Sequence, residues 1–330
     1  MNQEKILVEL GDNENQEVVP VVDSIELHEP QLFPRNLKYE QVDRIDSTPI
    51  LSSSAVQFPL YPNTKYMEGL NKINEEDGRF ERIIKLLKVA GTDLALVSLI
   101  VKGISTGLSH GTMDVIYRIG VGNRVREVLD NLDIAVGSLQ RRVIVSDLLA
   151  KAIRQTDADR ILSIAGGSCL LPIEGIYQSG KEGMTVVNVD RSEKANEKAE
   201  RTLNNINMKL NIGLSLQSVQ RDILKNGIDI LNNDRKAEII ECTGFWEYLN
   251  EEEREALLER VSEGMEFKDV FVLTVLVNNP QQKIFNAMKF KKLSPHTLKT
   301  LLPFAKKYFS KINGVFITPN ETYATLILKK

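Results

Sequence analysis

The part of the sequence after residue 157 constrains the fold most, because short apolar runs there alternate with longer amphipathic stretches. The runs are short and rich in β-branched residues, which is typical of strands that are covered on both faces of a parallel sheet. The pattern therefore predicts an α/β fold in which helices connect parallel strands. The runs lie at residues 160–165 (RILSIA), 184–189 (MTVVNV), 214–219 (LSLQSV), 237–242 (AEIIEC) and 270–277 (VFVLTVLV).

Two further runs, residues 314–318 and 322–329, predict the last strands of the same sheet. Only Pro319, Asn320 and Glu321 separate them. A link of this length permits an antiparallel hairpin but not a parallel crossover. We therefore expect a mostly parallel sheet of seven strands whose last strand is antiparallel.

Capping patterns predict where three of the connecting helices begin. Ser192 precedes one amphipathic stretch, and Asn250 precedes another in which Glu253 stands at capping-box distance. Ser294 is followed by Pro295, a residue favoured at the first position of a helix. We expect helices to start directly after Ser192, Asn250 and Ser294.

The distribution of proline divides the chain into three regions. Six of the eleven prolines lie within residues 1–62, which we interpret as an extended N-terminal arm because proline interrupts helices and central strands. Residues 63–155 contain no proline and show apolar residues at helical spacing, which predicts a helical cap domain. Residues 156–330 form the predicted sheet domain.

Composition argues against several classes of function. The 42 basic and 45 acidic residues give a net charge of −3, whereas a nucleic-acid partner would favour a basic face. Two cysteines do not make a disulfide framework and are ordinary in the cytoplasm, which is the predicted location. With only three scattered histidines, the sequence also predicts no metal centre.

Signals for export and for membrane insertion are not expected from this sequence. The first residues carry acids, where a signal peptide needs a basic start and a long apolar core. The most apolar stretch, residues 94–101, is flanked by Asp93 and Lys102. It is much shorter than the roughly 20 residues that cross a bilayer, so we expect a buried helical segment and no membrane partner.

Small and acidic residues follow the first three predicted strands, where an open parallel sheet binds its ligands. The first strand ends in a glycine-containing segment, residues 165–169 (AGGSC), which would let the backbone approach a ligand closely. The second ends at Asp190, whose carboxylate is placed to accept hydrogen bonds from the hydroxyls of a ribose. The third is followed by Asp222, a second carboxylate at the same edge.

Together these segments resemble the class I S-adenosylmethionine (SAM)-dependent methyltransferases, over about half of the chain from residue 154 onward. The resemblance implies a Rossmann-like fold and SAM as the cofactor. It implies that the cofactor contacts the glycine-rich loop, the ends of the next two strands and the end of the fourth strand. The residues so assigned are Ala165, Gly166, Gly167, Ser168, Asp190, Arg191, Asp222, Ile223, Cys242 and Thr243.

One position departs from the family pattern in a way that matters for the cofactor. Ser163 stands where the family usually has an acidic residue. The resemblance therefore implies that another group has to meet the ammonium of the methionine part of SAM. The dinucleotide fingerprint G-x-G-x-x-G is missing, which disfavours a nicotinamide dehydrogenase.

The residues on the acceptor side are predicted from position. Trp246 and Tyr248 follow the fourth strand, and Asn278 follows the fifth, so Trp246 and Asn278 are candidate substrate-binding residues and Tyr248 a candidate catalytic one. His110 in the helical region is a candidate base, and Tyr117 is a candidate substrate contact from a lid. Packing of Trp246 and Tyr248 under the helix that follows them is the competing interpretation.

Three functions remain open at this point. The first is a methyltransferase that acts on a small-molecule acceptor by direct in-line displacement. The second is an enzyme that uses the aminocarboxypropyl group of SAM, by transfer or cyclisation, and releases methylthioadenosine; residues 166–175 (GGSCLLPIEG) resemble nicotianamine synthase-type proteins. The third is a non-catalytic SAM-binding protein. The oligomeric state is also open, a homodimer being one candidate.

Overall fold

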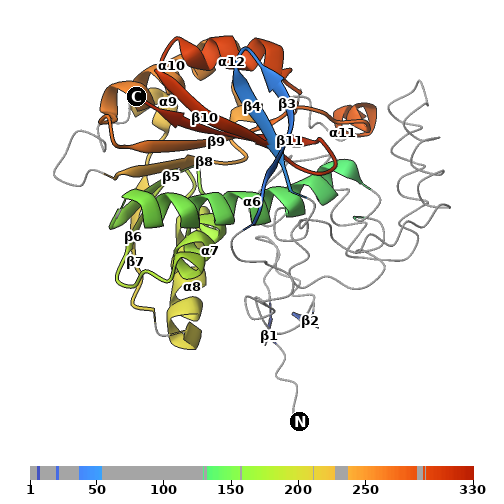
Figure 1. Ribbon diagram of the computed structural model, residues 1–330. Coiled ribbons are helices and arrows are strands. Elements are labelled where there is room, and N and C mark those ends of the chain that lie inside the picture. The colour runs from blue at the N-terminus through green and yellow to red at the C-terminus, as the bar shows by residue number, and fades with distance from the viewer. Residues whose placement is uncertain are drawn as a thin grey trace.

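The computed structural model describes residues 6–7, 20–21, 37–53, 129, 132–156, 158–210, 212–226, 237–287, 293 and 295–330. Their central feature is a nine-stranded sheet with the order β3-β4-β10-β11-β9-β8-β5-β6-β7. Two short strands, β1 (Ile6–Leu7) and β2 (Pro20–Val21), pair with each other outside it. The chain is therefore an α/β protein built on one large mixed sheet (Figure 1).

The seven strands predicted from the sequence are all present. Neighbouring strands among β5 to β9 are parallel, whereas β11 runs antiparallel to both β9 and β10, as the short link between the last two strands predicts. Their bounds are β5 (Arg160–Ile164), β6 (Thr185–Asp190), β7 (Ser215–Gln220), β8 (Ile239–Cys242), β9 (Val270–Leu276), β10 (Lys311–Ile317) and β11 (Tyr323–Lys329).

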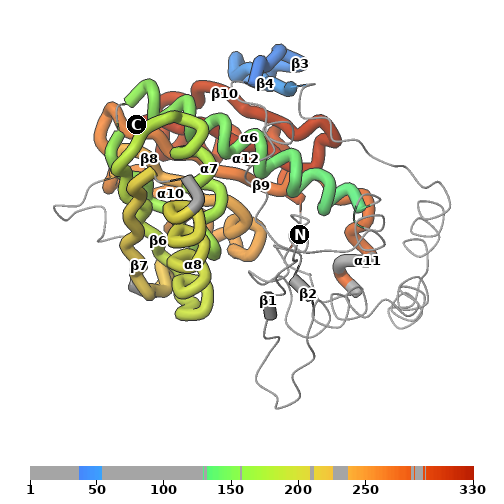
Figure 2. The backbone as a smooth tube through the Cα atoms, turned by 90° about the horizontal axis from the view of Figure 1, so that it is seen from below, coloured from blue at the N-terminus to red at the C-terminus, as the bar shows by residue number. Residues whose placement is uncertain are grey.

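The expected total of seven strands is wrong, because the N-terminal arm contributes two more. Strands β3 (Glu40–Ile45) and β4 (Thr48–Ser52) form an antiparallel hairpin, and β4 pairs in parallel with β10. The turn residues Asp46 and Ser47 both have positive φ, as the tight two-residue turn of a hairpin requires. Proline counts alone could not reveal this hairpin, which lies beyond β10 at the outer edge of the sheet (Figure 2).

Helices cover both faces of the sheet. Helices α6 (Asp133–Thr156), α7 (Leu170–Ser179) and α8 (Glu193–Leu210) supply apolar side chains to one face, and α10 (Glu251–Gly264) and α12 (Leu298–Lys306) supply them to the other. Figure 1 shows α6 crossing the sheet. The shorter helices are α9 (Ile223–Asn226), η3 (Trp246–Tyr248) and α11 (Gln282–Ala287).

Alternation along the strands builds two separate hydrophobic cores. Ile161 of β5 lies in the core under α6, α7 and α8, whereas the next residue, Leu162, lies in the core under α10 and α12. Ile239 and Ile240 of β8 divide in the same way. Side chains of a strand point alternately to its two faces, so a strand covered on both sides is apolar throughout. This arrangement explains why the strands could be read from short continuous apolar runs.

Two of the three predicted helix starts are confirmed. Helix α8 begins directly after Ser192, and Asn250 with Glu253 forms a complete capping box at the start of α10. The predicted start at Pro295 is wrong, because α12 begins at Leu298 with Thr297 as its N-cap. Nearby, the backbone N–H of His296 donates to the carbonyl oxygen of Leu276 at the end of β9. This tertiary hydrogen bond keeps the chain extended beyond the proline.

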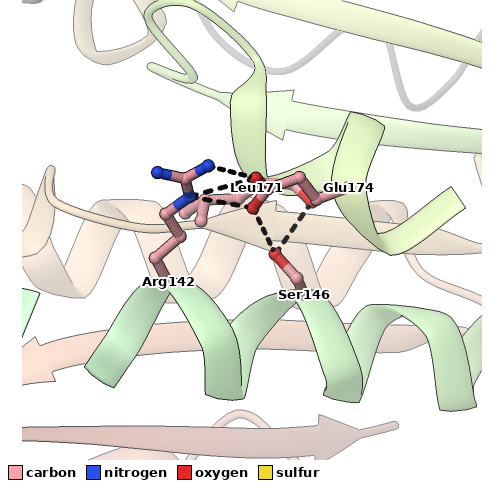
Figure 3. A network of polar contacts seen from close by, with 4 residues as sticks. All are labelled: Arg142, Ser146, Leu171 and Glu174. Carbon is pink, nitrogen blue, oxygen red and sulfur yellow. Dashed lines mark hydrogen bonds and ion pairs between the residues drawn. The ribbon is translucent and has the colours of Figure 1, made fainter. Parts of the chain in front are cut away.

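A buried ion pair fixes α6 to α7. The Arg142 Nε atom donates to both carboxylate oxygens of Glu174, at 3.1 and 3.0 Å, and Nη2 also bonds to Oε1. Ser146 donates to Glu174 Oε2 at 3.2 Å and contacts the carbonyl oxygen of Leu171 (Figure 3). Because α7 directly follows the glycine-rich loop, this network also fixes where that loop is held.

A second polar network holds the N-terminal arm against α6. The buried carboxylate of Asp147 accepts hydrogen bonds from the backbone N–H of Leu37, the hydroxyl of Tyr39 and Lys151 Nζ. Lys151 Nζ also donates to the Leu37 carbonyl oxygen at 2.6 Å and lies 4.5 Å from the centroid of the Tyr39 ring. Burial and the neighbouring Asp147 carboxylate raise the pKa of Tyr39. The hydroxyl therefore stays protonated and remains a donor.

We expect Asp147→Ala to release the β3–β4 hairpin from the body of the protein. The substitution removes the acceptor of three hydrogen bonds, each contributing about 1 kcal/mol or more. Trypsin should then cleave after Arg44, inside β3, at least about tenfold faster than in the wild type. Glu40→Ala, which removes an exposed carboxylate from the same strand at a distance from the cleaved bond, is the matched control. Equal cleavage rates for wild type and Asp147→Ala would contradict this anchoring role.

Much of the predicted helical cap lies outside the described residues, including 54–128. Helix α6, from the end of that predicted domain, packs directly on the sheet domain. Within the part of the chain that the structure describes, no helix is both long and apolar enough to span a membrane.

Candidate functional site

The loop after β5 has a sharply turned backbone that could contact a ligand closely. Ala165, Gly167 and Cys169 all have positive φ, between 51° and 56°, so the chain turns sharply before α7 begins. At Gly166 there is no room for a side chain, because an ideal Cβ would lie 2.0 Å from Ser163 Oγ and 2.8 Å from Asn188 Oδ1. Glycine is therefore required at 166 by packing, and the loop presents its backbone at the carboxyl end of β5.

Asp190 links the glycine-rich loop to the start of α8. Its Oδ2 atom accepts a hydrogen bond from the Gly167 N–H at 3.2 Å, and its Oδ1 atom accepts one from the Ser192 N–H at 2.8 Å. The carboxylate is partly exposed, and each of its oxygens retains a lone pair for a further donor. The structure thus brings Gly166, Gly167 and Asp190 together, while Arg191 is exposed beside them.

Asp222 and Ile223, the predicted cofactor contacts after the third strand, follow β7 at the same edge of the sheet. Asp222 Oδ1 accepts from the Leu224 N–H at 3.1 Å and so begins the short helix α9, and the carboxylate remains partly exposed. The Ile223 side chain is buried in the core under α10. Asp222 is therefore available at the edge, and a cofactor contact from Ile223 remains a prediction.

The end of β8 carries the other predicted contacts. Cys242 is fully buried in the core, whereas Thr243 is partly exposed and donates through Oγ1 to Thr274 Oγ1 at 3.4 Å. Tyr248 in η3 is partly exposed, and burial raises the pKa of its hydroxyl, with the Glu247 carboxylate contributing to the same direction. Tyr248 is thus a hydrogen-bond donor at neutral pH.

Trp246 is packed in the way that the competing interpretation expects. Its ring is 1% exposed and makes edge-to-face contacts with His296 and Phe304, while the Arg254 guanidinium lies 5.6 Å from its centroid. The indole Nε1 atom is buried without a hydrogen-bond partner. Partial burial and the nearby Arg254 lower the pKa of His296 to about 4, which keeps its imidazole neutral. Substrate contact by Trp246 remains a prediction.

Asn278 follows β9, which is parallel to β8, at the same edge of the sheet, and two other predicted residues are not described. The Asn278 side chain is exposed, whereas its neighbour Asn279 is buried and bonded within the turn before α11. His110 and Tyr117 lie outside the described residues. Among the residues that are described, no group of three or more histidine, cysteine or acidic side chains could hold a metal ion.

A row of polar side chains crosses the sheet beneath the glycine-rich loop, and sequence reasoning missed it. Ser163 of β5 is in register with Asn188 of β6 on one side and with Glu241 of β8 on the other. All three residues are buried, and Ser163 Oγ donates to Glu241 Oε2 at 2.7 Å. The available signal was Glu241, which lies between Ile240 and Cys242 as the second of two glutamates in the run AEIIEC. Pairing it with Ser163 required the strand order.

Two more buried charges lie near Glu241. Arg141 of α6 stacks on the Tyr323 ring, 4.4 Å from its centroid, and packs against Gly244. Its positive charge counteracts the rise in pKa that burial causes in both Glu241 and Glu247. Both carboxylate oxygens of Glu247 are buried. This edge therefore combines a backbone cradle, an accessible carboxylate at Asp190 and a buried, mostly acidic charge cluster.

Comparisons with known proteins bear on the fold. The structure is similar to that of a protein from Bordetella parapertussis, described as a possible exported protein, with a TM-score of 0.61 and 14% identity over 81% of this chain and 95% of that one. No protein-family model matches the sequence, and a search of curated proteins gave no match.

Two further solved structures align less closely. A DUF574 family protein from Streptomyces avermitilis has a TM-score of 0.48 and 14% identity over 69% of this chain and 99% of that one. An O-methyltransferase family protein from Burkholderia thailandensis has a TM-score of 0.46 and 10% identity over 75% of this chain and 71% of that one.

Proposed function

We propose that this chain, an α/β protein whose sequence resembles the class I SAM-dependent methyltransferases, binds SAM at the carboxyl edge of β5, β6 and β8 and transfers its methyl group to a small-molecule acceptor by direct in-line displacement. The observation that carries the proposal is the junction of Gly167 and Asp190, where a backbone cradle meets a partly exposed carboxylate across 3.2 Å. A ribose with two free hydroxyls is the group that such a junction suits.

The residues present fit this cofactor on structural grounds. Gly166 lets the loop pack directly on Ser163, and a Cβ at Gly167 would meet nothing within 4 Å, so the backbone at Gly167 is open to a ligand. Asp190 has free lone pairs for the ribose, and Asp222 stands at the next strand end for the adenine side. SAM, when bound, supplies a methyl group that its sulfonium already activates. The protein then mainly supplies position and a dry environment.

Tyr248 and Glu247 would bind the acceptor and accept its proton. Tyr248, with its raised pKa, would donate a hydrogen bond to the acceptor rather than act as a base. Glu247 is buried, and burial raises the pKa of its carboxyl, while the Arg141 charge counteracts that rise. A carboxylate in this state suits a general base for a hydroxyl or amine nucleophile. His110, Tyr117, Trp246 and Asn278 stay in the proposal as acceptor-side residues.

The acceptor and location are argued from composition. The near-neutral net charge of −3 supports a small molecule over a nucleic acid. Both cysteines are buried and unpaired, which supports a reducing compartment such as the cytoplasm. The segment GGSCLLPIEG, which forms the loop and the first turns of α7, supports the use of the aminocarboxypropyl group as a second candidate.

Calorimetry with SAM and product analysis test these alternatives in order. We expect SAM to bind with a measurable heat and NAD to give none, since the dinucleotide fingerprint is missing. Turnover with a panel of small phenols, alcohols and amines should then yield S-adenosylhomocysteine. Methylthioadenosine as the product would support the second candidate, and binding without either product would support a non-catalytic protein. Lack of SAM binding would overturn the whole proposal.

A further inference from the structure

The Ser163–Glu241 pair places a carboxylate directly beneath the glycine-rich loop. The two residues are opposite each other on adjacent parallel strands and are 0% and 2% exposed. The serine hydroxyl donates to Glu241 Oε2 at 2.7 Å, which holds the carboxylate against the end of β5. An ideal Cβ on Gly166 would touch the same serine oxygen at 2.0 Å, so the loop backbone lies immediately above the pair.

The buried charges around this pair have an acidic excess. Glu241 and Glu247 are each 2% exposed, and among the described residues the buried Arg141 is the cation that lowers the pKa of both. Arg254 also influences Glu247, but it is only half-buried and packs over Trp246. Burying a carboxylate is costly unless a cation or hydrogen-bond donors meet it. Backbone hydrogen bonds and the charges of Arg141 and Arg254 offset part of the cost of burying Glu247, so a positively charged ligand group beside the cluster would offset the acidic charge that remains.

An unpartnered acceptor on the other side of Ser163 points the same way. Asn188 is 0% exposed, and its Oδ1 atom has no hydrogen-bond partner, although its Nδ2 atom donates to Asn196 and to the carbonyl oxygen of Gly167. Asn188 and Glu241 are the two neighbours of Ser163 in the same register row. The three residues of this row thus contribute acceptors and no cation of their own, while Arg141 and hydrogen bonds from Ser163 and Thr243 already act on Glu241.

We propose that Glu241 of β8, held in place by Ser163 of β5, is the carboxylate that binds the α-ammonium group of SAM. This inference rests on the proposed function. In the family pattern the carboxylate is on the strand that corresponds to β5, but this chain has Ser163 at that position. Glu241 of the adjacent strand β8 is directly opposite Ser163 and would supply the carboxylate instead. The binding energy would come from a buried, charge-assisted hydrogen bond between the ammonium group and the Glu241 carboxylate.

Three ligands test the assignment. SAM and S-adenosylhomocysteine both carry the ammonium group, whereas methylthioadenosine lacks the amino-acid chain. Because S-adenosylhomocysteine shares the uncharged sulfur of methylthioadenosine, the loss expected for SAM when Glu241 is replaced should recur with S-adenosylhomocysteine if Glu241 meets the ammonium and not the sulfonium. We expect Glu241→Gln to raise the Kd for SAM about 10- to 100-fold in calorimetry, the size of a hydrogen bond to a charged group. The Kd for methylthioadenosine should change by less than about twofold. Glutamine keeps the shape of the side chain and can still accept from Ser163.

A matched control and a reciprocal variant separate binding from folding. Glu238→Gln makes the same substitution just before β8, at the opposite end of the strand, and should leave both affinities unchanged. The double variant Ser163→Asp with Glu241→Ser moves the carboxylate back across the register pair. We expect it to bind SAM within about tenfold of the wild type, and clearly more tightly than Glu241→Gln. This variant decides the question even where methylthioadenosine binds too weakly to measure.

The outcomes distinguish the failure of this inference from the failure of the proposed function. SAM binding that is unchanged in Glu241→Gln overturns the inference and leaves the proposed function in place. An equal loss for SAM and methylthioadenosine also overturns it, because Glu241 would then be structural. If the wild type binds none of the three ligands, the proposed function itself is wrong. Selective loss for SAM together with recovery in the double variant supports the inference.

Discussion

Glu174→Leu is expected to lower the free energy of unfolding by about 3–5 kcal/mol, the typical cost of removing one partner of a buried ion pair. The substitution deprives the buried Arg142 guanidinium of a carboxylate that accepts from both Nε and Nη2. It also removes the acceptor of the Ser146 hydroxyl. Urea denaturation, followed by fluorescence of the single tryptophan, Trp246, measures the loss.

Two companion variants show whether the loss comes from the ion pair. Arg142→Met combined with Glu174→Leu removes both charges and should recover most of the stability, because apolar replacements of a buried pair are often neutral. Glu182→Leu removes an exposed glutamate and should change stability by no more than about 0.5 kcal/mol. If the double variant is as unstable as Glu174→Leu, the cost comes from packing at residue 174 rather than from the unmatched charge.

Asp190→Ala is expected to weaken SAM binding by about 100-fold or more. The carboxylate would accept both ribose hydroxyls, and each hydrogen bond to a charged group contributes about 1.5–3 kcal/mol. The substitution also removes the acceptor of the Gly167 and Ser192 amides, so part of the loss reflects a less ordered loop. Isothermal titration calorimetry with SAM measures the total.

A ligand without ribose hydroxyls separates the two contributions. For the 2′,3′-dideoxy form of methylthioadenosine, the penalty of Asp190→Ala should be at least about tenfold smaller than for methylthioadenosine itself, because no hydroxyl is left to bind. Asp159→Ala, at the far end of β5 and exposed, should leave both affinities unchanged. An equal penalty for both ligands would mean that Asp190 only shapes the loop, and the ribose assignment would be wrong.

The fold was predictable to the extent that it depends on local patterns. The runs at 160–165 and 184–189 are apolar because their strands are covered on both faces, so they can be recognised without knowing their neighbours. The capping box at Asn250 and Glu253 depends on residues three positions apart, and it formed as predicted. The β3–β4 hairpin was not recognised, because its place at the sheet edge depends on pairing with β10, more than 250 residues away.

The residues of the candidate site also fall into those that local patterns predict and those that depend on the tertiary structure. The glycines at 166 and 167 and the carboxylate of Asp190 were predicted, because each directly follows a strand whose end the sequence marks. The residues missed were Glu241 and Arg141, whose importance arises only when β8 lies beside β5 and α6 crosses the sheet. A glutamate within the apolar end of the fourth run was visible in the sequence, but its pairing with Ser163 and Arg141 was not.

The sequence by itself determined that the chain is an α/β protein with a mostly parallel sheet, and where glycines and an acid meet the strand ends, because hydrophobic alternation and turn chemistry act between near neighbours. Only the tertiary structure decided which buried charges share a space. Strand order and helix packing bring Ser163 to Glu241 across 78 positions of the chain and place Arg141 near Glu241. Electrostatic interactions depend on distance in space and on burial, and neither is written in the spacing of residues along the sequence.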